Sequence, residues 1–419
     1  MHGMSKLNTE IFIARRISSP EGGRKNVMVR IATLTVAVGM AVMIVALAVI
    51  SGFKKDITEK LVGFGGHVRI VSLNSNSSFE TAPVPIDTAL MEEISRVETF
   101  RSVVPFAMKG GIIKTPDAIH GVVLKGFGPQ EDNAFLSAAL IEGALPETGD
   151  SVRRKDLLIS KRISEMLMLG VDDRVEIMFI SETRPVRRDR FKVCGIYSSG
   201  MDEMDKTMVF TDIRNVQRVN GWDEHTASGY EVMTTDFDRL ANFTEDVFIA
   251  VFRHAERMED PLKVEDVVSL NPNVFDWLAA HDVNAAVIII IMMLVALLNM
   301  ISAMLIILLE KTSMIGLLKA LGMTNWSIQK VFIIRSLRIV FKGMAWGNAI
   351  GLAVVFLQKF TGLVRLDSGG YLISVVPVNI DWWWFVALNV GVPLIMALLL
   401  VIPALVVTRI KPDRTMRYQ

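Results

Sequence analysis

Cysteine is almost absent from this chain of 419 residues, which contains only Cys194. A single cysteine excludes a disulfide bond within the chain, so an oxidising compartment is neither supported nor excluded. The chain also lacks an excess of either charge sign, because 45 basic and 44 acidic residues give a formal net charge of +1. The net charge therefore gives no indication of partners, and we expect no nucleic acid among them.

The motifs of common enzyme families are also missing. No G-x-x-x-x-G-K-[ST] occurs, so the chain has no P-loop with which to hold ATP phosphates. Glycine-rich stretches at residues 63–66 and 126–128 lack the strand, spacing and helix of a dinucleotide fingerprint, and we expect turns there. The six histidines show no metal-ligand spacing, and there is no G-x-S-x-G. We therefore expect a non-catalytic chain with no cofactor or metal ion of its own.

What the sequence does contain is long apolar runs. Hydrophobic residues make up 51% of the chain, and crossing a bilayer core of about 30 Å takes about 20 helical residues. The third run is short and follows Arg335, Arg338 and Lys342, which share one helical face and could reach the membrane interface. An alternative there is a soluble amphipathic helix leading into a shorter span. The predicted spans are residues 31–52, 283–309, 326–357 and 382–408.

Basic residues around the spans predict their orientation. Six lie within residues 1–30, where we expect an amphipathic helix, and four lie within the tail 409–419. Lysine and arginine favour the cytoplasmic side, so both termini are predicted to be cytoplasmic, in agreement with four spans. The segment 310–325 is then cytoplasmic too, and 53–282 and the loop 358–381 lie outside. A cleaved signal peptide is the competing interpretation of the first run, but that run exceeds the usual core of about 7–15 residues.

The segment 53–282 has the sequence pattern of a soluble domain, with short alternating strands and short amphipathic helices. Strands are predicted at residues 67–73, 121–125, 175–180 and 191–197, and helices at 86–95, 160–169 and 211–219. The predicted fold class is a membrane protein with four transmembrane α-helices and a large α+β extracytoplasmic domain between helices 1 and 2.

Four motifs resemble the FtsX/MacB-type permeases of ABC transporters. They are E-x-x-x-x-I-G-x-L-K-A-L-G-M at 310–323, F-I-A-R-R at 12–16, D-L-L-I-S-K-R-I-S-E-x-L-x-L-G-V-D-D-R-V at 156–175, and I-K-P-x-x-x-M-R at 410–417. Within that group the chain is most similar to the lipoprotein-releasing permeases of the LolC/LolE type.

The resemblance implies a function and a set of partners. In such permeases, two transmembrane chains in the bacterial inner membrane pair with two copies of a separate ATPase, which holds ATP and Mg. The implied partners are a LolD-like ATPase, a second permease chain in a homodimer, lipoprotein cargo, a LolA-like periplasmic carrier and membrane lipid. ATP-driven closure would be transmitted mechanically to extract lipoproteins. The alternatives are an FtsX-like regulator of a cell-wall hydrolase and a MacB-like efflux component.

The segment 310–325 is expected to dock on the ATPase, as the corresponding helix does in the family. Gly316 and Gly322 permit close approach and a sharp turn. A merely solvated connector is the other interpretation. The apolar knob would be Met314, Ile315 and Leu318, with a polar rim of Glu310, Lys311 and Lys319.

The resemblance also places acylated cargo between the first and second spans of opposite subunits. Both spans are rich in methionine, whose flexible thioether suits varied acyl chains. Ordinary packing is the alternative for each of these side chains. The residues are Met40, Met43, Met292, Met293, Met300 and Met304.

Two further features complete the candidate sites. The hairpin tip 181–190 is expected to contact the lipoprotein carrier, as a loop at this place does in LolC-like relatives; a solvated basic turn is the alternative. Three glycines spaced by four residues in the third span predict a face that packs within the bundle. The hairpin residues are Arg184, Pro185, Val186, Arg187, Arg188 and Arg190, and the glycines are Gly343, Gly347 and Gly351.

Overall fold

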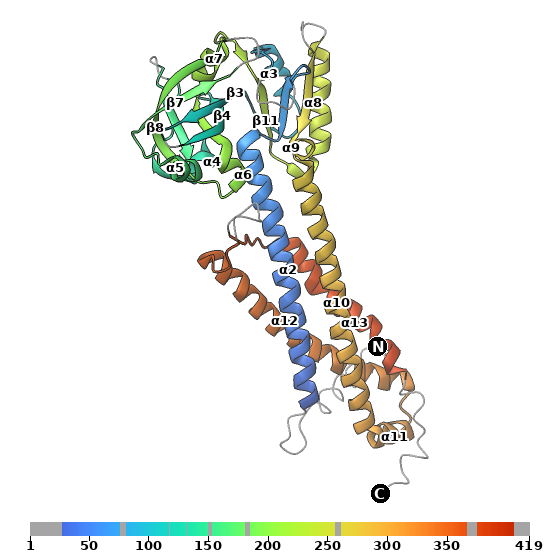
Figure 1. Cartoon of the computed structure of the whole chain (residues 1–419). Coiled ribbons are helices and arrows are strands. Elements are labelled where there is room, and N and C mark those ends of the chain that lie inside the picture. The colour runs from blue at the N-terminus through green and yellow to red at the C-terminus, as the bar shows by residue number, and fades with distance from the viewer. Residues whose placement is uncertain are drawn as a thin grey trace. The chain divides into compact units, whose positions relative to one another are not determined.

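The computed structural model describes residues 27–75, 81–116, 118–130, 132–149, 153–180, 185–255, 261–366 and 375–405, and its contacts divide the chain into two compact units (Figure 1). The helical unit takes the described residues within Met1–Lys55, Trp277–Val364 and Val376–Gln419, and the α+β unit those within Asp56–Asp276 and Arg365–Val375. Residues 1–26 of the predicted N-terminal helix, Arg184 and the predicted tail lie outside the described residues.

Four helices are long and apolar enough to cross a membrane, over Val29–Gly65, Pro272–Glu310, Asn325–Thr361 and Trp382–Ala404. They confirm the four predicted spans. The third helix is unbroken for 37 residues, so its basic turn and its apolar run form one element. The elements are α2 (Val27–Gly65), α10 (Pro272–Glu310), α11 (Thr312–Ala320), α12 (Asn325–Thr361), α13 (Trp382–Leu399) and α14 (Val401–Ala404).

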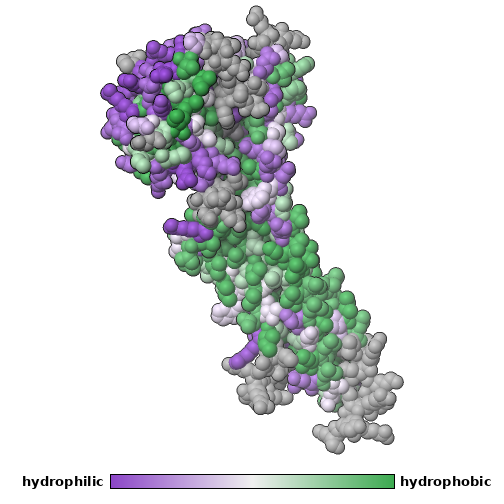
Figure 2. Space-filling model, viewed as in Figure 1, coloured by the Kyte–Doolittle hydropathy of each residue, from purple (hydrophilic) through white to green (hydrophobic). Residues whose placement is uncertain are grey.

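The outward surface of the helical unit is hydrophobic over most of the face shown in Figure 2. Ile290, Phe341 and Leu394 are among the large exposed side chains of this unit, while Phe332 and Met396 belong to its buried core. Apolar surface of this extent must be covered in the cell, and lipid covers it in a membrane protein. The α+β unit, in contrast, is largely hydrophilic in the same view.

The α+β unit follows the predicted class, an α+β domain between the first and second spans. Its strands are β1 (Val68–Ser72), β2 (Val84–Pro85), β3 (Phe100–Lys114), β4 (Ile119–Phe127), β5 (Leu140–Gly143), β6 (Asp156–Ser160), β7 (Arg174–Phe179), β8 (Arg187–Tyr197), β9 (Met208–Asp212), β10 (Thr226–Ala227), β11 (Gly229–Thr234) and β12 (Leu262–Asp266). Its helices are α3 (Thr88–Ile94), α4 (Ala134–Ala139), α5 (Lys161–Leu167), α6 (Asp202–Thr207), α7 (Ile213–Asn220), η1 (Phe237–Arg239), α8 (Leu240–Ala255) and α9 (Val267–Leu270).

Six strands of this unit close into a ring. Strand β3 pairs with β4 and also with β7, β4 pairs with β9, and β9 with β6. Strand β6 then pairs with β8, and β8 returns to β7. Closure removes the free sheet edges of these six strands. Buried apolar side chains such as Leu124, Ile159, Ile177 and Val209 form the core of this part.

The first half of β3 belongs to a second, antiparallel sheet in the order β12-β1-β11-β3. Helix α8 packs on β12 and on α3 at this sheet (Figure 1). Strand β3 therefore holds the two parts of the unit together.

All seven short elements expected from the sequence are present, namely β1, β4, β7 and β8 with α3, α5 and α7. Strand β3 was not predicted, because Lys109, Gly110 and Gly111 interrupt its apolar pattern. In the structure Lys109 is buried, and a Cβ added at Gly111 would come within 2.8 Å of the Ile177 side chain. Glycine is thus required where β7 approaches β3 closely.

Candidate functional site

A short helix, α11, connects the second and third spans. Helix α10 ends at Glu310, and Gly322, with φ of +89°, turns the chain after α11. The Thr324 hydroxyl then caps α12 by accepting a hydrogen bond from the Ser327 N–H at 3.3 Å. Positive φ suits glycine and the cap fixes the start of α12, so both ends of the connector are defined.

The predicted docking knob is not an exposed surface. Ile315 is fully buried, and Met314 and Leu318 pack against the core of the helical unit. The knob prediction is corrected on this point, because the apolar face of α11 is used for packing within the chain. The exposed apolar side chains are Leu317 and Leu321, at 56% and 75% exposure, and we call this pair the coupling face.

The other predicted coupling residues surround the coupling face in the sequence. Glu310 and Gly322 are exposed, Lys311 and Lys319 are half-buried, and Gly316 is buried. Sequence reasoning missed Leu317 and Leu321, although their spacing of four residues brings them to one side of a helix.

The predicted cargo methionines mostly lie inside the helical unit. Met40, Met43, Met300 and Met304 are each at most 2% exposed, and Met292 and Met293 are half-buried. Assigning Met40, Met43 and Met300 to an acyl-receiving surface is therefore corrected, because packing within the chain already encloses them. The large apolar side chains exposed on α10 are aliphatic instead, and include Ile290, Leu294 and Leu298 at a spacing of four.

The glycine face of α12 lies against α2 of the same chain. A Cβ at Gly343 would come within 2.7 Å of Val36 Cβ, and one at Gly347 within 2.6 Å of the Ala37 carbonyl oxygen. At Gly351 the nearest atom, Ile44 Cβ, is 3.1 Å away. These glycines let the two helices pack closely.

The arginines near the hairpin tip are partly committed to the α+β unit itself. Arg187, the first residue of β8, donates hydrogen bonds to the carbonyl oxygens of Arg218 and Val219 at the end of α7. Arg188 and Arg190 lie 3.9 and 3.4 Å from Glu176 on the facing strand. All three arginines therefore have partners within the α+β unit.

The loop between β7 and β8 still presents exposed side chains. Pro185 and Val186 are exposed at its tip, and Arg188 and Arg190 keep most of their surface in solvent. Exposed ion pairs of this kind contribute little to stability, so these arginines can exchange partners at low cost.

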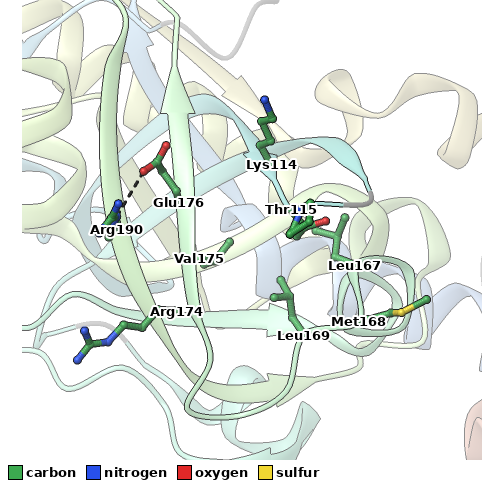
Figure 3. Close-up of a pocket in the computed structure, with 10 residues that line it drawn as sticks. Lys114, Thr115, Leu167, Met168, Leu169, Arg174, Val175, Glu176 and Arg190 are labelled. Atoms are coloured by element: carbon green, nitrogen blue, oxygen red, sulfur yellow. Dashed lines mark hydrogen bonds and ion pairs between the residues drawn. The ribbon is translucent and has the colours of Figure 1, made fainter.

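A cavity of about 490 Å³ lies at the base of this hairpin (Figure 3). Leu169 and Val175 form part of its apolar wall, and Glu176 and Arg190 point toward one another across β7 and β8. Lys114 stands at the far side from Arg174 in this view. A cavity with an apolar wall and a basic rim can hold an apolar side chain that carries acidic neighbours.

The α+β unit contains one cysteine, Cys194, and its thiol is not activated as a nucleophile. Burial raises the pKa of the Cys194 thiol to about 12, so the thiolate needed for nucleophilic chemistry does not form at neutral pH. Within the described part of the chain, no three His, Cys, Asp or Glu side chains gather as a metal site would require.

Comparison with known proteins gives two family matches. The FtsX-like permease C-terminal model matches residues 286–412, and the MacB-like periplasmic core domain model matches residues 31–247. The first match begins within α10 and continues through the later spans, and the second covers α2 from residue 31 and most of the α+β unit.

Curated relatives extend over nearly the whole chain. The lipoprotein-releasing system transmembrane protein LolC of Xylella fastidiosa is 23% identical over 405 residues, which is 92% of each chain. LolC of Neisseria meningitidis is 21% identical over 83% of each chain. LolE of Haemophilus influenzae is 19% identical over 90% of this chain and 91% of its own.

Two solved structures also match. The extracellular domain of the ABC-type transporter YknZ from Gram-positive bacteria is 13% identical with a TM-score of 0.33, over 48% of this chain and 99% of its own. The periplasmic region of MacB from Actinobacillus actinomycetemcomitans is 15% identical with a TM-score of 0.33, over 52% and 97%. From the two family models, the chain belongs to the FtsX-like permeases that carry a MacB-like periplasmic core domain.

Proposed function

We propose that this chain is the permease subunit of an ATP-driven ABC transporter that extracts lipoproteins from the bacterial inner membrane and passes them to a periplasmic carrier. The observation that carries the proposal is the similarity to LolC over 92% of both chains. This similarity extends over both units and over the connector between the second and third spans. A similarity limited to one of the two units would not distinguish between the candidate functions.

The proposed orientation places both termini and α11 in the cytoplasm and the α+β unit in the periplasm. The basic residues that flank the first and last spans support it. Lys54, just after the first span, opposes the rule, but its ammonium lies 3.5 Å from the Asp282 carboxylate on α10. Its charge is therefore locally balanced on the periplasmic side.

Mechanical transmission is supported by the continuity of two helices. Helices α2 and α10 each run for 39 residues without a break, from the membrane segment into the sequence of the α+β unit. Their packing includes an edge-on contact between the rings of Phe53 and Trp277, with centroids 5.8 Å apart. A continuous helix carries a displacement along its axis. A separate LolD-like ATPase with ATP and Mg would supply the stroke, acting on a homodimer of this chain.

Docking of the ATPase is assigned to the coupling face. Leu317→Asp should reduce copurification of the ATPase and its permease-stimulated activity by about tenfold or more, because a charge would be buried in the contact. The matched control is Leu363→Asp, which places the same charge on an exposed leucine beyond the other end of α12. Equal loss in both variants, or none in Leu317→Asp, would remove the coupling face from the mechanism.

Cargo is assigned to the exposed side of α10. A photocrosslinker at Leu294 should form an adduct with acylated lipoprotein in membranes that contain the cognate ATPase, whereas one at buried Met300 should not. The adduct should disappear when ATP drives release to the carrier.

The same crosslinks discriminate between the candidate functions. A Leu294 adduct with lipoprotein that does not respond to ATP would contradict release. Release without any adduct would place the cargo elsewhere. Capture of a cell-wall hydrolase by the α+β unit would favour the FtsX-like alternative, and an outer-membrane channel partner would favour MacB-like efflux.

Carrier contact is assigned to the exposed hairpin tip at Pro185 and Val186, together with the cavity at its base. Arg188 and Arg190 keep their guanidinium groups in solvent while paired with Glu176. An acidic carrier surface could replace Glu176 as their partner without leaving a buried charge.

A further inference from the structure

Four arginines from three separate elements gather around one cavity of the α+β unit, with a volume of about 590 Å³. Arg153 precedes β6, Arg187 begins β8, and Arg214 and Arg218 lie on α7. Sequence reasoning singled out only Arg187, because the other three are far from it in the chain. The fold thus assembles a concentration of positive charge that no single motif displays.

The end of α7 shapes this cavity. Gly221 has φ of +68° and ends the helix, with its N–H donating to the Arg218 carbonyl oxygen at 3.1 Å. The Trp222 N–H donates to the Gln217 carbonyl oxygen at 2.8 Å. This left-handed turn fixes Trp222 in the cavity wall.

Two of the four arginines already have partners. The Arg214 Nε lies 3.1 and 2.9 Å from the two carboxylate oxygens of buried Asp212. Arg187 donates to backbone carbonyl oxygens at the end of α7, a contact that satisfies N–H groups but neutralises no charge. Asp189, another acidic side chain whose charge acts on Arg153, accepts a hydrogen bond from Lys155.

Arg153 and Arg218 differ from these two. Among the residues that the structure describes, no carboxylate lies within ion-pair distance of either guanidinium. Burial lowers the pKa of Arg153, and the positive charge of Arg218 lowers it further, against the opposing influence of Asp189 and Asp212. Arg153 is still protonated at neutral pH, so the like charges are held together at a cost that a bound anion would relieve.

The cavity wall also carries two carboxylates, Asp223 and Glu224, both exposed. Asp223 accepts a hydrogen bond from the Thr226 hydroxyl at 2.5 Å. Four arginines against these two carboxylates leave an excess of two positive charges on the wall, and buried Asp212, which pairs with Arg214, reduces this excess to one.

We propose that this cavity binds a phosphate group, either as free phosphate or as the headgroup of a phospholipid. A phosphate group carries one or two negative charges, which the excess positive charge attracts, and its oxygens suit the planar fork of guanidinium. An acidic peptide presents one charge per side chain and needs an extended groove rather than a recess. Trp222 in the wall would pack beside the non-phosphate part of a headgroup. The site does not depend on the lipoprotein assignment.

The test uses the full-length protein in a non-ionic detergent and measures binding of inorganic phosphate and of dihexanoyl phosphatidic acid by calorimetry. The double variant Arg153→Gln/Arg218→Gln should weaken both by about tenfold or more, because charged hydrogen bonds are lost. The matched control, Arg96→Gln/Arg162→Gln, removes the same charge from exposed positions of the same unit and should change affinity less than about twofold.

Comparing the affinities for inorganic phosphate and for dihexanoyl phosphatidic acid shows whether the bound phosphate group is free or part of a lipid headgroup. Equal affinities indicate a free-anion site, and tighter binding of the phosphatidic acid indicates a headgroup site. Equal weakening in cavity and control variants, or no saturable binding to the wild-type protein, would overturn the proposal. Saturable binding of hexaglutamate that phosphate does not displace would replace it with peptide docking. Should the double variant misfold, the single variants Arg153→Gln and Arg218→Gln provide the same comparison.

Discussion

Replacing Lys125 with methionine is expected to lower the free energy of unfolding of the α+β unit by about 3 kcal/mol. The Lys125 ammonium lies 2.7 Å from the Glu231 carboxylate, and the two side chains are only 1% and 5% exposed. It also donates to the Phe64 carbonyl oxygen at 2.8 Å, in the last turn of α2. Removing it takes away the nearer of the two positive charges beside the buried Glu231 carboxylate. The value is set at the low end of the usual range because Arg69 remains 3.5 Å from the other Glu231 oxygen.

The measurement is urea unfolding of the full-length protein, with hydrogen exchange of β4 and β11 as the readout. Two further variants isolate the effect of the buried charge. Arg239→Met breaks an exposed pair with Glu98 and should cost less than about 1 kcal/mol. Lys125→Met/Glu231→Leu removes both buried charges and should regain much of the loss. If Lys125→Met costs no more than Arg239→Met, the buried pair is not what secures the end of α2.

The buried pair gives a structural role to the glycine-rich stretch at residues 63–66. The turn expected there is corrected, because residues 63–65 are the last residues of α2, and residues 126 and 127 of the other expected turn belong to β4. The Phe64 ring packs against Phe135 and Phe210, with centroids 5.1 and 6.0 Å away. A Cβ at Gly63 would come within 2.4 Å of Phe135, and Gly66, with φ of +72°, leads the chain out of the helix. These contacts seat the end of α2 inside the α+β unit, and Gly66 provides the left-handed residue with which the chain leaves the helix.

The parts of the fold that could be predicted from sequence are those that local pattern determines. The four spans follow from hydropathy and length, and the glycine spacing at Gly343, Gly347 and Gly351 marks a packing face because it recurs within one helix. Residues 175–180 and 191–197 were recognisable as strands for the same reason, since alternation needs no knowledge of the partner.

The ring of six strands could not be predicted, because its closure depends on pairings between distant segments, such as β3 with β7 and β9 with β6. The Lys125–Glu231 pair joins residues 106 positions apart. A buried lysine also looks like any exposed one in a sequence.

The candidate site shows the same limit. Ile315 and Leu317 are equally apolar in the sequence, and only packing against α12 decides that the first is buried and the second exposed. The sequence does not show that Arg187 has partners, because the carbonyl oxygens to which it donates belong to Arg218 and Val219 at the end of α7. Local composition indicated which segments matter, whereas tertiary contacts determine which side chains are available.

Substituting Gly347 with alanine is expected to destabilise the helical unit by about 1–3 kcal/mol, the usual cost of overpacking a tight contact. The added Cβ would lie 2.6 Å from the Ala37 carbonyl oxygen and 2.6 Å from Met40 Cβ. One of these atoms is backbone, so α2 and α12 must move apart instead of a side chain turning aside. The measurement is the thermal unfolding midpoint of the purified protein in detergent.

Two other glycines of the helical unit make this result specific. At Gly351 the nearest atoms to a new Cβ are 3.1 and 3.2 Å away, so Gly351→Ala should have a smaller effect. At Gly391 on α13 nothing lies within 4 Å, and Gly391→Ala should be neutral or slightly stabilising because alanine favours a helix over glycine. The unfolding midpoint should be highest for Gly391→Ala, intermediate for Gly351→Ala and lowest for Gly347→Ala. Equal midpoints for all three would mean that α12 does not pack against α2 through its glycine face, and the close approach of the first and third spans would have to be abandoned.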